Sequence, residues 1–116
     1  MADSNDIAAL SRQLLNLATQ MEQLAPEVAD AKTVKEYDSD RRKALLAVHV
    51  APLLVGNSAS AAEHIARASA AYATGMKTLQ QNLLTAHTAL AKADALQCRF
   101  EAVRSVLSVQ KATLAL

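Results

Sequence analysis

The side chains that could bind a metal or carry out catalysis are few and scattered in this sequence. The histidines are His49, His64 and His87, and the single cysteine is Cys98. A protein zinc site needs ligands at short spacings, such as two histidines three or four residues apart on a helix. No two histidines have that spacing, and no cysteine or carboxylate pair completes a ligand set. The sequence therefore predicts neither a metal site nor a cofactor.

Two further groups of residues resemble catalytic pairs in composition but not in geometry. Glu63 and His64 are adjacent, and adjacent residues of a helix do not face each other. Ser105 and Ser108 lie in a basic segment, but no general base with an orienting acid can be assigned to either hydroxyl. The chain also lacks a glycine-rich phosphate loop. We therefore expect a protein that is not an enzyme.

The elements that position these residues are predicted to be helices. The 116 residues are 52% hydrophobic but only 3% aromatic, with two glycines and two prolines. Strong helix formers, alanine above all, dominate the chain, and the β-branched and aromatic runs that form strands are absent. This length allows one domain at most. The sequence predicts a single all-α domain spanning residues 1–116.

The first predicted helix covers about residues 4–24 and has apolar residues at alternating spacings of three and four. This spacing is typical of a coiled-coil seam. Asp3 or Ser4 can cap the start of the helix. Pro26 disfavours helix at the residue before it and suits a first helical position, so a second helix is expected from residue 26; a kink in one continuous helix is the alternative. The seam consists of Ile7, Leu10, Leu14, Leu17, Met21, Leu24 and Val28.

The second predicted helix covers about residues 26–54 and contains the polar stretch KEYDSDRRK at 35–43. Asp38 and Arg42 are four residues apart, so their ion pair is expected to stabilise an exposed helical face by a few tenths of a kcal/mol. Pro52 and the sequence VGNS then predict a loop at 55–59. The inner face of this helix is predicted to contain Val34, Tyr37, Arg41, Leu45 and Val48.

The third predicted helix covers about residues 60–114, and Ser60 and Glu63 form the capping box at its start. Such a helix would be roughly 80 Å long, so we expect a hairpin or bundle of long helices with coiled-coil seams. Two successive steps of four, from Ala68 to Tyr72 and from Tyr72 to Met76 beside Gly75, indicate a stutter or bend. Gln97 either fixes the register of the seam or faces solvent. The seam is Ile65, Ala68, Tyr72, Met76, Leu79, Leu83, Ala86, Leu90, Ala93, Gln97, Phe100, Val103, Leu107 and Leu114.

The alanine-rich composition predicts a homo-oligomer. Alanine side chains bury little surface, so at roughly 25 cal/mol per Å² a lone chain has a thin core and gains most by sharing its seams with copies of itself. The residues expected to carry this assembly are Leu10, Leu14, Leu17, Leu83, Leu90, Phe100 and Leu107.

Charge is distributed unevenly along the chain. Residues 1–40 contain eight acidic and three basic residues (net −5), and residues 41–116 contain nine basic and three acidic residues (net +6). Near the C-terminus, Arg99, Arg104 and Lys111 border an apolar stripe, as cations do at the edges of a coiled-coil seam. A DNA-binding face is more often polar throughout. This pattern favours pairing with an acidic helix, and single-stranded nucleic acid is the other candidate partner.

The chain has no predicted membrane segment. Its acidic N-terminus lacks the apolar region of a signal peptide, and its most apolar run, at 44–55, is too short to span a bilayer and contains His49 and Pro52. A single cysteine fits a reducing compartment. We expect a cytoplasmic protein without a membrane partner.

One stretch, at 37–72, contains Ala-Arg-Ala-Ser at 66–69 followed by Tyr72. Another, at 100–116, contains Arg104, Ser105, Ser108 and Lys111. These two stretches resemble small all-helical early proteins of bacteriophages and prophages, of the kind encoded beside single-strand annealing recombination genes. Together they cover somewhat under half of the chain. The resemblance implies a phage origin, the cytosol of a bacterial host, and a role in DNA metabolism or host takeover.

Three functional hypotheses follow. The first is an accessory protein of DNA recombination that binds a recombination protein, from phage or host, or single-stranded DNA. The second is an antagonist that binds and occludes a host enzyme or defence protein. The third is a structural coiled-coil spacer. Steep weakening of binding by salt is expected only if DNA is the partner.

Overall fold

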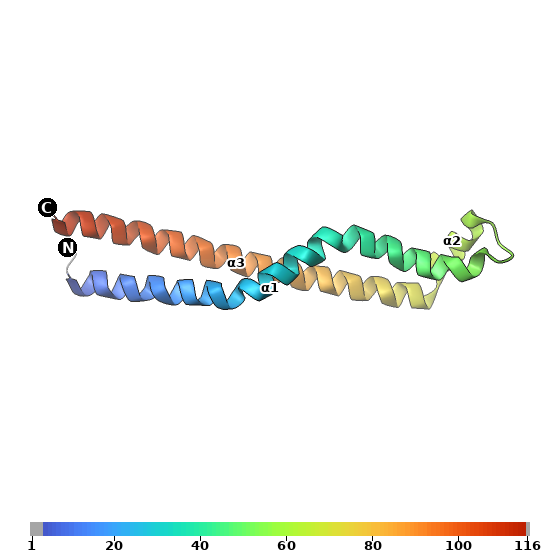
Figure 1. The fold of residues 1–116 in the computed structure, drawn as a ribbon, viewed down its shortest axis with the longest axis horizontal. Coiled ribbons are helices and arrows are strands. Elements are labelled where there is room, and N and C mark those ends of the chain that lie inside the picture. The colour runs from blue at the N-terminus through green and yellow to red at the C-terminus, as the bar shows by residue number, and fades with distance from the viewer. Residues whose placement is uncertain (1–3, 116) are drawn as a thin grey trace. The chain divides into compact units, whose positions relative to one another are not determined.

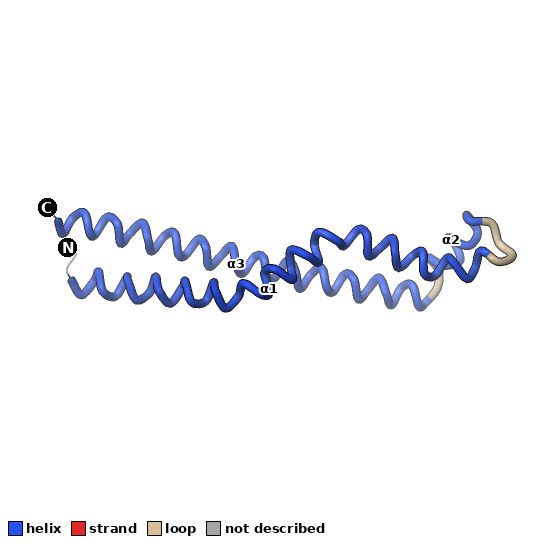
Figure 2. The backbone as a smooth tube through the Cα atoms, viewed as in Figure 1, coloured by secondary structure: helices blue, strands red, loops and turns tan. Residues whose placement is uncertain are grey.

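The structure is a computed structural model that describes residues 4–115. Its elements are α1 (Ser4–Val50), the 3₁₀ helix η1 (Ala51–Leu54), α2 (Ala59–Ala68) and α3 (Ala70–Ala115). Figure 1 shows their order along the chain, and Figure 2 shows that the described residues are helical apart from short connections and include no strand. The prediction of an all-α fold built on a long helix pair is confirmed.

The chain divides into two compact units, and both long helices contribute to each. Unit 1 comprises residues 1–29 and 89–116, and unit 2 comprises residues 30–88. Unit 1 therefore pairs the N-terminal part of α1 with the C-terminal part of α3. Unit 2 contains the rest of both helices together with η1 and α2. The prediction of one domain spanning residues 1–116 stays a prediction.

The core of unit 1 is a row of leucines contributed by both helices. Leu17 and Leu24 of α1 and Leu96 of α3 are buried against one another, with Phe100 and Val103 packed beside them. Every residue of the predicted first seam, from Ile7 to Val28, is buried or half-buried. The seam is therefore confirmed as the inner face of α1. Its apolar residues face α3 of the same chain, which removes them from water without a second copy.

The predicted helix boundary at Pro26 is wrong, and the alternative of one continuous helix is correct. Helix α1 continues through Pro26 from Ser4 to Val50. Proline lacks the amide hydrogen of the helical ladder and crowds the carbonyl four residues earlier, which costs about 3 kcal/mol. Leu24 is buried and Val28 half-buried on either side of it, whereas Pro26 itself is exposed. Burial of the neighbouring residues offsets the cost of the proline, so the helix does not end there.

The predicted helix at 60–114 is also wrong, because Ser69 separates α2 from α3. Ser69 has an extended backbone (φ −75°, ψ 146°). Its hydroxyl donates to the Ala66 carbonyl at 2.8 Å and accepts from the Tyr72 amide at 3.2 Å. One serine thus satisfies backbone groups at the end of α2 and at the start of α3, which is the role that serine plays at helix caps.

The cap of α2 and its packed face both differ from prediction. The N-cap is Ser58, whose hydroxyl accepts from the Ala61 amide at 3.2 Å, and not Ser60. Glu63 accepts a hydrogen bond from Arg67 at 2.7 Å instead of closing a capping box. Helix α2 packs against η1 and buries Ala62 and Ala66. The predicted seam residues Ile65 and Ala68 are exposed.

The inner face of α1 in unit 2 is rotated from the predicted one. Val34 and Leu45 are half-buried as expected, but Tyr37, Arg41 and Val48 are exposed. The positions predicted for them are taken by half-buried Asp38, Arg42 and His49. The Asp38 carboxylate accepts from Arg42 Nε at 2.9 Å, and its side chain is only 19% exposed. The two opposite charges satisfy each other, which allows a polar pair on a packed face.

The seam of α3 follows the prediction except at its C-terminal side. Tyr72, Leu83, Leu90 and the seam residues between them are buried or half-buried. Gln97 is exposed, and its amide donates to Glu101 at 3.0 Å. Leu96 is buried in its place, and Leu114 is exposed. Of the two readings of Gln97, the solvent-facing one is correct, because two successive steps of three from Leu90 to Leu96 shift the packed face.

Candidate interaction surfaces

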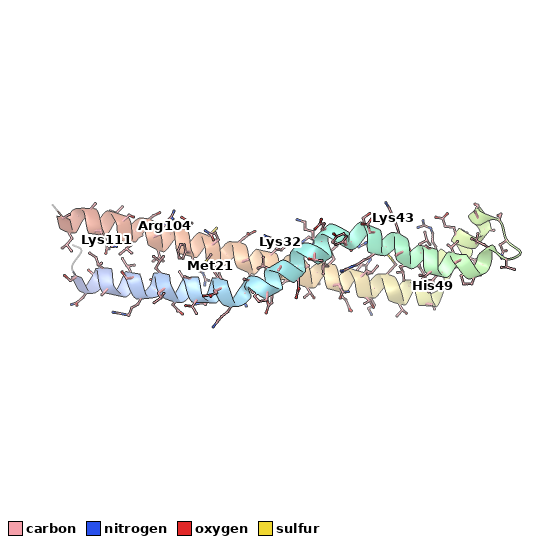
Figure 3. The ribbon with its side chains drawn as sticks, viewed as in Figure 1. Met21, Lys32, Lys43, His49, Arg104 and Lys111 are labelled. Atoms are coloured by element: carbon pink, nitrogen blue, oxygen red, sulfur yellow. The ribbon has the colours of Figure 1, made fainter. Side chains whose placement is uncertain are left out.

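The three predicted cationic residues lie on the exposed edges of α3 in unit 1. Arg99, Arg104 and Lys111 are all exposed, and Figure 3 shows Arg104 and Lys111 projecting from α3. Arg104 Nη2 lies 2.6 Å from Glu101 Oε2. An exposed ion pair of this kind contributes at most about 1 kcal/mol, so the Arg104 guanidinium can exchange this partner for another anion at little cost.

The apolar stripe between these cations is already packed. Phe100 and Val103 lie against the leucine core of unit 1, and Leu107 is 6% exposed. Two valines on the outer side of the same helix, Val106 and Val109, remain exposed. The C-terminal half of α3 therefore exposes both cations and apolar side chains, with Val106 near Arg99 and Val109 on the opposite side of the helix from Lys111.

The predicted assembly residues lie inside the helix pairing of the chain. Leu17 and Leu107 are buried and the other members half-buried. Their role in a homo-oligomer stays a prediction, since burial within one chain already accounts for their apolar character. The members of this set are Leu10, Leu14, Leu17, Leu83, Leu90, Phe100 and Leu107.

Unit 1 has a small hollow between polar side chains. Its volume is about 180 Å³, and the polar lining residues Gln20, Gln23, Glu27 and Lys92 accompany the buried Leu24 and Leu96. Lys92 and Glu27 are both exposed. An amide, a carboxylate and an ammonium in a surface hollow can bind water or a polar side chain of a partner.

Unit 2 has a larger, mostly apolar groove between α1 and α3 that the sequence analysis missed. Its volume is about 440 Å³. Ala44 and Val48 form its α1 side, while Gly75 and Thr78 form its α3 side. Sequence reasoning missed it because Val48 was assigned to the packed face. The signal was the spacing of Tyr37, Arg41, Ala44, Val48 and Ala51, which alternates four and three. The lining residues are Arg41, Ala44, Leu45, Val48, Gly75, Thr78 and Leu79.

The residues considered for chemistry are not brought together. His49 packs edge-on against the Tyr72 ring, with centroids 6.1 Å apart, while His64, His87 and Cys98 are exposed. Within residues 4–115, no three His, Cys, Asp or Glu side chains are grouped closely enough to hold a metal ion. The Glu63 carboxylate raises the pKa of Arg67 through their hydrogen bond.

No described helix combines the length and the apolar character needed to cross a bilayer. Comparison of the chain with protein-family models, with curated proteins and with solved structures finds no match in any of the three.

Proposed function

We propose that this protein acts by binding, as an accessory to DNA recombination, and that the C-terminal half of α3 engages a recombination protein or single-stranded DNA. The observation that carries the proposal is the mixed outer surface of this segment. Arg99, Arg104 and Lys111 are exposed there, and Val109 of the same helix is 66% exposed. These cations do not stabilise the core, and the valines remain exposed to water. Both features are typical of a surface that binds a partner.

The charge of this surface selects an anionic partner. Arginine binds carboxylates and phosphates with a planar, two-pronged set of donors, and lysine adds a point charge. Acidic side chains of a recombination protein and DNA phosphates both meet this requirement. Exposed Val106 and Val109 favour the protein, because apolar surface gains from burial against a protein core and gains little from a phosphate backbone.

The recombination context rests on the resemblance to phage and prophage early proteins. Arg104 and Lys111 belong both to the motif that carries this resemblance and to the proposed surface. The motif serines, Ser105 and Ser108, are exposed on the same helix. Their hydroxyls can donate to the same anions that the cations attract.

An antagonist of a host enzyme or defence protein is the second candidate. The exposed valines support it, because an inhibitor needs apolar contact area and does not need contact with DNA. Its partner would bind the same α3 segment and would leave single-stranded DNA unbound. Indifference to DNA together with capture of a host protein would therefore favour this candidate over the first.

The test uses two variants with the same change in charge. Binding of a labelled single-stranded oligonucleotide, and of a purified single-strand annealing protein, is measured by fluorescence anisotropy at low and high salt. Arg104→Gln/Lys111→Gln is expected to lose binding, whereas Lys32→Gln/Lys43→Gln, which removes two exposed cations from unit 2, should retain it. If DNA is the partner, the first variant also reduces the slope of the logarithm of the binding constant against the logarithm of salt concentration, by the amount expected for the loss of about two phosphate contacts. Equal binding by both variants would refute the proposal.

A further inference from the structure

The outer side of α1 in unit 2 has a second seam that the fold leaves exposed. Its members follow one another at spacings of four, three, four and three, which place them along one side of a helix over about four turns. Tyr37 is 47% exposed and Val48 is 67% exposed, so their apolar surface stays in water. The second seam is Tyr37, Arg41, Ala44, Val48 and Ala51.

The groove between this seam and α3 has the lining of a helix-binding site. Its volume is about 440 Å³, and the small residues Ala44, Gly75 and Thr78 leave it open. The Thr78 hydroxyl donates to the Thr74 carbonyl at 3.2 Å, so its hydrogen is already used by its own helix. Small residues let the backbone of a further helix approach closely, as when an amphipathic helix binds in a groove between two others.

Arg41 is the one charged residue among the described residues that line the groove. It is exposed and forms no ion pair with a described residue, whereas the next arginine, Arg42, is paired with Asp38. Residues 70–93 of α3 include no Asp or Glu. Asp40 lies about 100° further around α1 and does not line the groove. The groove therefore combines an apolar surface with a guanidinium that has no carboxylate to bind.

We propose that this groove binds an acidic amphipathic helix of another protein. The apolar stripe of that helix packs on Ala44 and Val48, and its aspartate or glutamate binds the Arg41 guanidinium. A carboxylate matches the two-pronged donors of arginine, and this geometry makes the pair both strong and specific. The site lies in unit 2, so the proposal is independent of the recombination role of the C-terminal half of α3.

Two other occupants match the groove less well. Nucleic acid binds through many phosphates and needs several cations, but the groove lining has only Arg41 among the described residues. A second copy of the chain would present the same seam, which contains no carboxylate for Arg41. An acidic helix supplies both the apolar side chains and the missing negative charge.

The first test uses synthetic helical peptides as probes for the full chain. The first peptide has leucines at alternating spacings of three and four, glutamates on both edges of this stripe, and a hydrocarbon staple on the opposite side that keeps it helical. Glutamates on both edges allow contact with Arg41 in either orientation. Two further peptides have glutamine or lysine in place of the glutamates. In fluorescence anisotropy, the glutamate peptide is expected to bind about tenfold more tightly than either of the others. Absence of binding, or equal binding of all three peptides, would overturn the proposal.

Charge reversal identifies the contact. Arg41→Glu is expected to weaken binding of the glutamate peptide by about tenfold or more and to favour the lysine peptide instead. Lys43→Glu is the matched control, because it makes the same change in charge on the same helix. Lys43 does not line the groove and projects away from α3 (Figure 3), so this variant should keep the preference for the glutamate peptide. The same preference in Arg41→Glu would refute the assigned contact.

Filling the groove tests its apolar part. Thr78→Trp places an indole in the groove and should abolish binding of the glutamate peptide. Leu84→Trp should bind it as the wild type does, since Leu84 is 67% exposed on the same helix and lies outside the groove. Circular dichroism checks that all variants keep the helical content of the wild type. Light scattering without peptide tests the second copy, and a labelled single-stranded oligonucleotide tests nucleic acid. A wild-type dimer that Thr78→Trp dissociates, or oligonucleotide binding that Arg41→Glu abolishes, would overturn the proposal in favour of that occupant.

Discussion

The side chain of Leu45 occupies the space that a β-carbon on Gly75 would need. Its Cδ1 and Cδ2 atoms lie 2.7 and 2.9 Å from that position. Alanine at this position would have a helix propensity better by about 1 kcal/mol, so the glycine is accounted for by packing and not by backbone conformation. This contact joins α1 to α3 inside unit 2 and shapes the groove beside it.

Gly75→Ala should therefore change sign with the residue at position 45. With Leu45 present, overlap costs about 1–3 kcal/mol, and the helix propensity gain leaves a net loss of zero to about 2 kcal/mol. In a Leu45→Ala background the same change should stabilise by about 1 kcal/mol. A double-mutant cycle from urea unfolding, at fixed protein concentration, measures the coupling. Equal effects in both backgrounds would show that the contact carries no energy.

Truncation of the unit 1 core should be costly. Leu17→Ala and Leu107→Ala are each expected to lower the free energy of unfolding by about 2–5 kcal/mol, because a buried leucine leaves a cavity. Leu15→Ala is the control, since Leu15 is 69% exposed on the same helix as Leu17, and its effect should stay within about 0.5 kcal/mol. If all three variants unfold at the same denaturant concentration, the assigned core is wrong.

Ser69 should contribute more to the free energy of unfolding than Ser60 does. Ser69→Ala removes hydrogen bonds at the end of α2 and the start of α3, and about 1–2 kcal/mol of stability should be lost. Ser60→Ala should be neutral or slightly stabilising, because alanine is the better helix former and Ser58 is the cap. Thermal unfolding of the two variants provides the comparison. A larger loss of stability for Ser60→Ala than for Ser69→Ala would favour the predicted capping box at Ser60 and Glu63.

The two acidic partners of arginine, Asp38 and Glu63, should differ in importance. Asp38→Ala leaves Arg42 half-buried without its carboxylate, at a cost of about 1–3 kcal/mol. Glu63→Ala breaks a pair whose side chains are about half exposed, and should cost much less than Asp38→Ala, because water screens an exposed pair. Unfolding at low and high salt separates them further, since salt screens the exposed pair more strongly. Similar losses for both would mean that Asp38 is not held on a packed face.

The sequence predicted best where packing is apolar and regular. The first seam, from Ile7 to Val28, is uninterrupted, and its periodicity identified the inner face of α1 residue by residue. The prediction failed at Pro26 because the cost of a proline is local, whereas the burial of Leu24 and Val28 that offsets it depends on α3. Periodicity alone does not reveal that compensation.

The groove of unit 2 was not predicted from the sequence for a similar reason. Between Val34 and Val48, two seams run along α1, one through Asp38 and Arg42 and one through Tyr37, Arg41 and Val48. Hydrophobicity favoured the second, but the structure packs the first, because the two charges of the first neutralise each other. Which seam faces α3 depends on the rotation of the whole helix. The contact of Leu45 with Gly75 constrains that rotation, and Gly75 lies outside this stretch of sequence.

The division of each long helix between two units sets an order for folding. Leu45 and Gly75 are 30 positions apart in the chain, whereas Leu24 and Leu96 are 72 apart. Bringing distant segments together costs more chain entropy than closing a short loop. We therefore expect unit 2 to form first, around the turn at 55–58. The parts of α1 and α3 that belong to unit 1 are then expected to pair afterwards. Pulse-labelling hydrogen exchange during refolding should show amides of 40–50 protected before those of 10–24, and simultaneous protection would indicate that the two closures are not sequential.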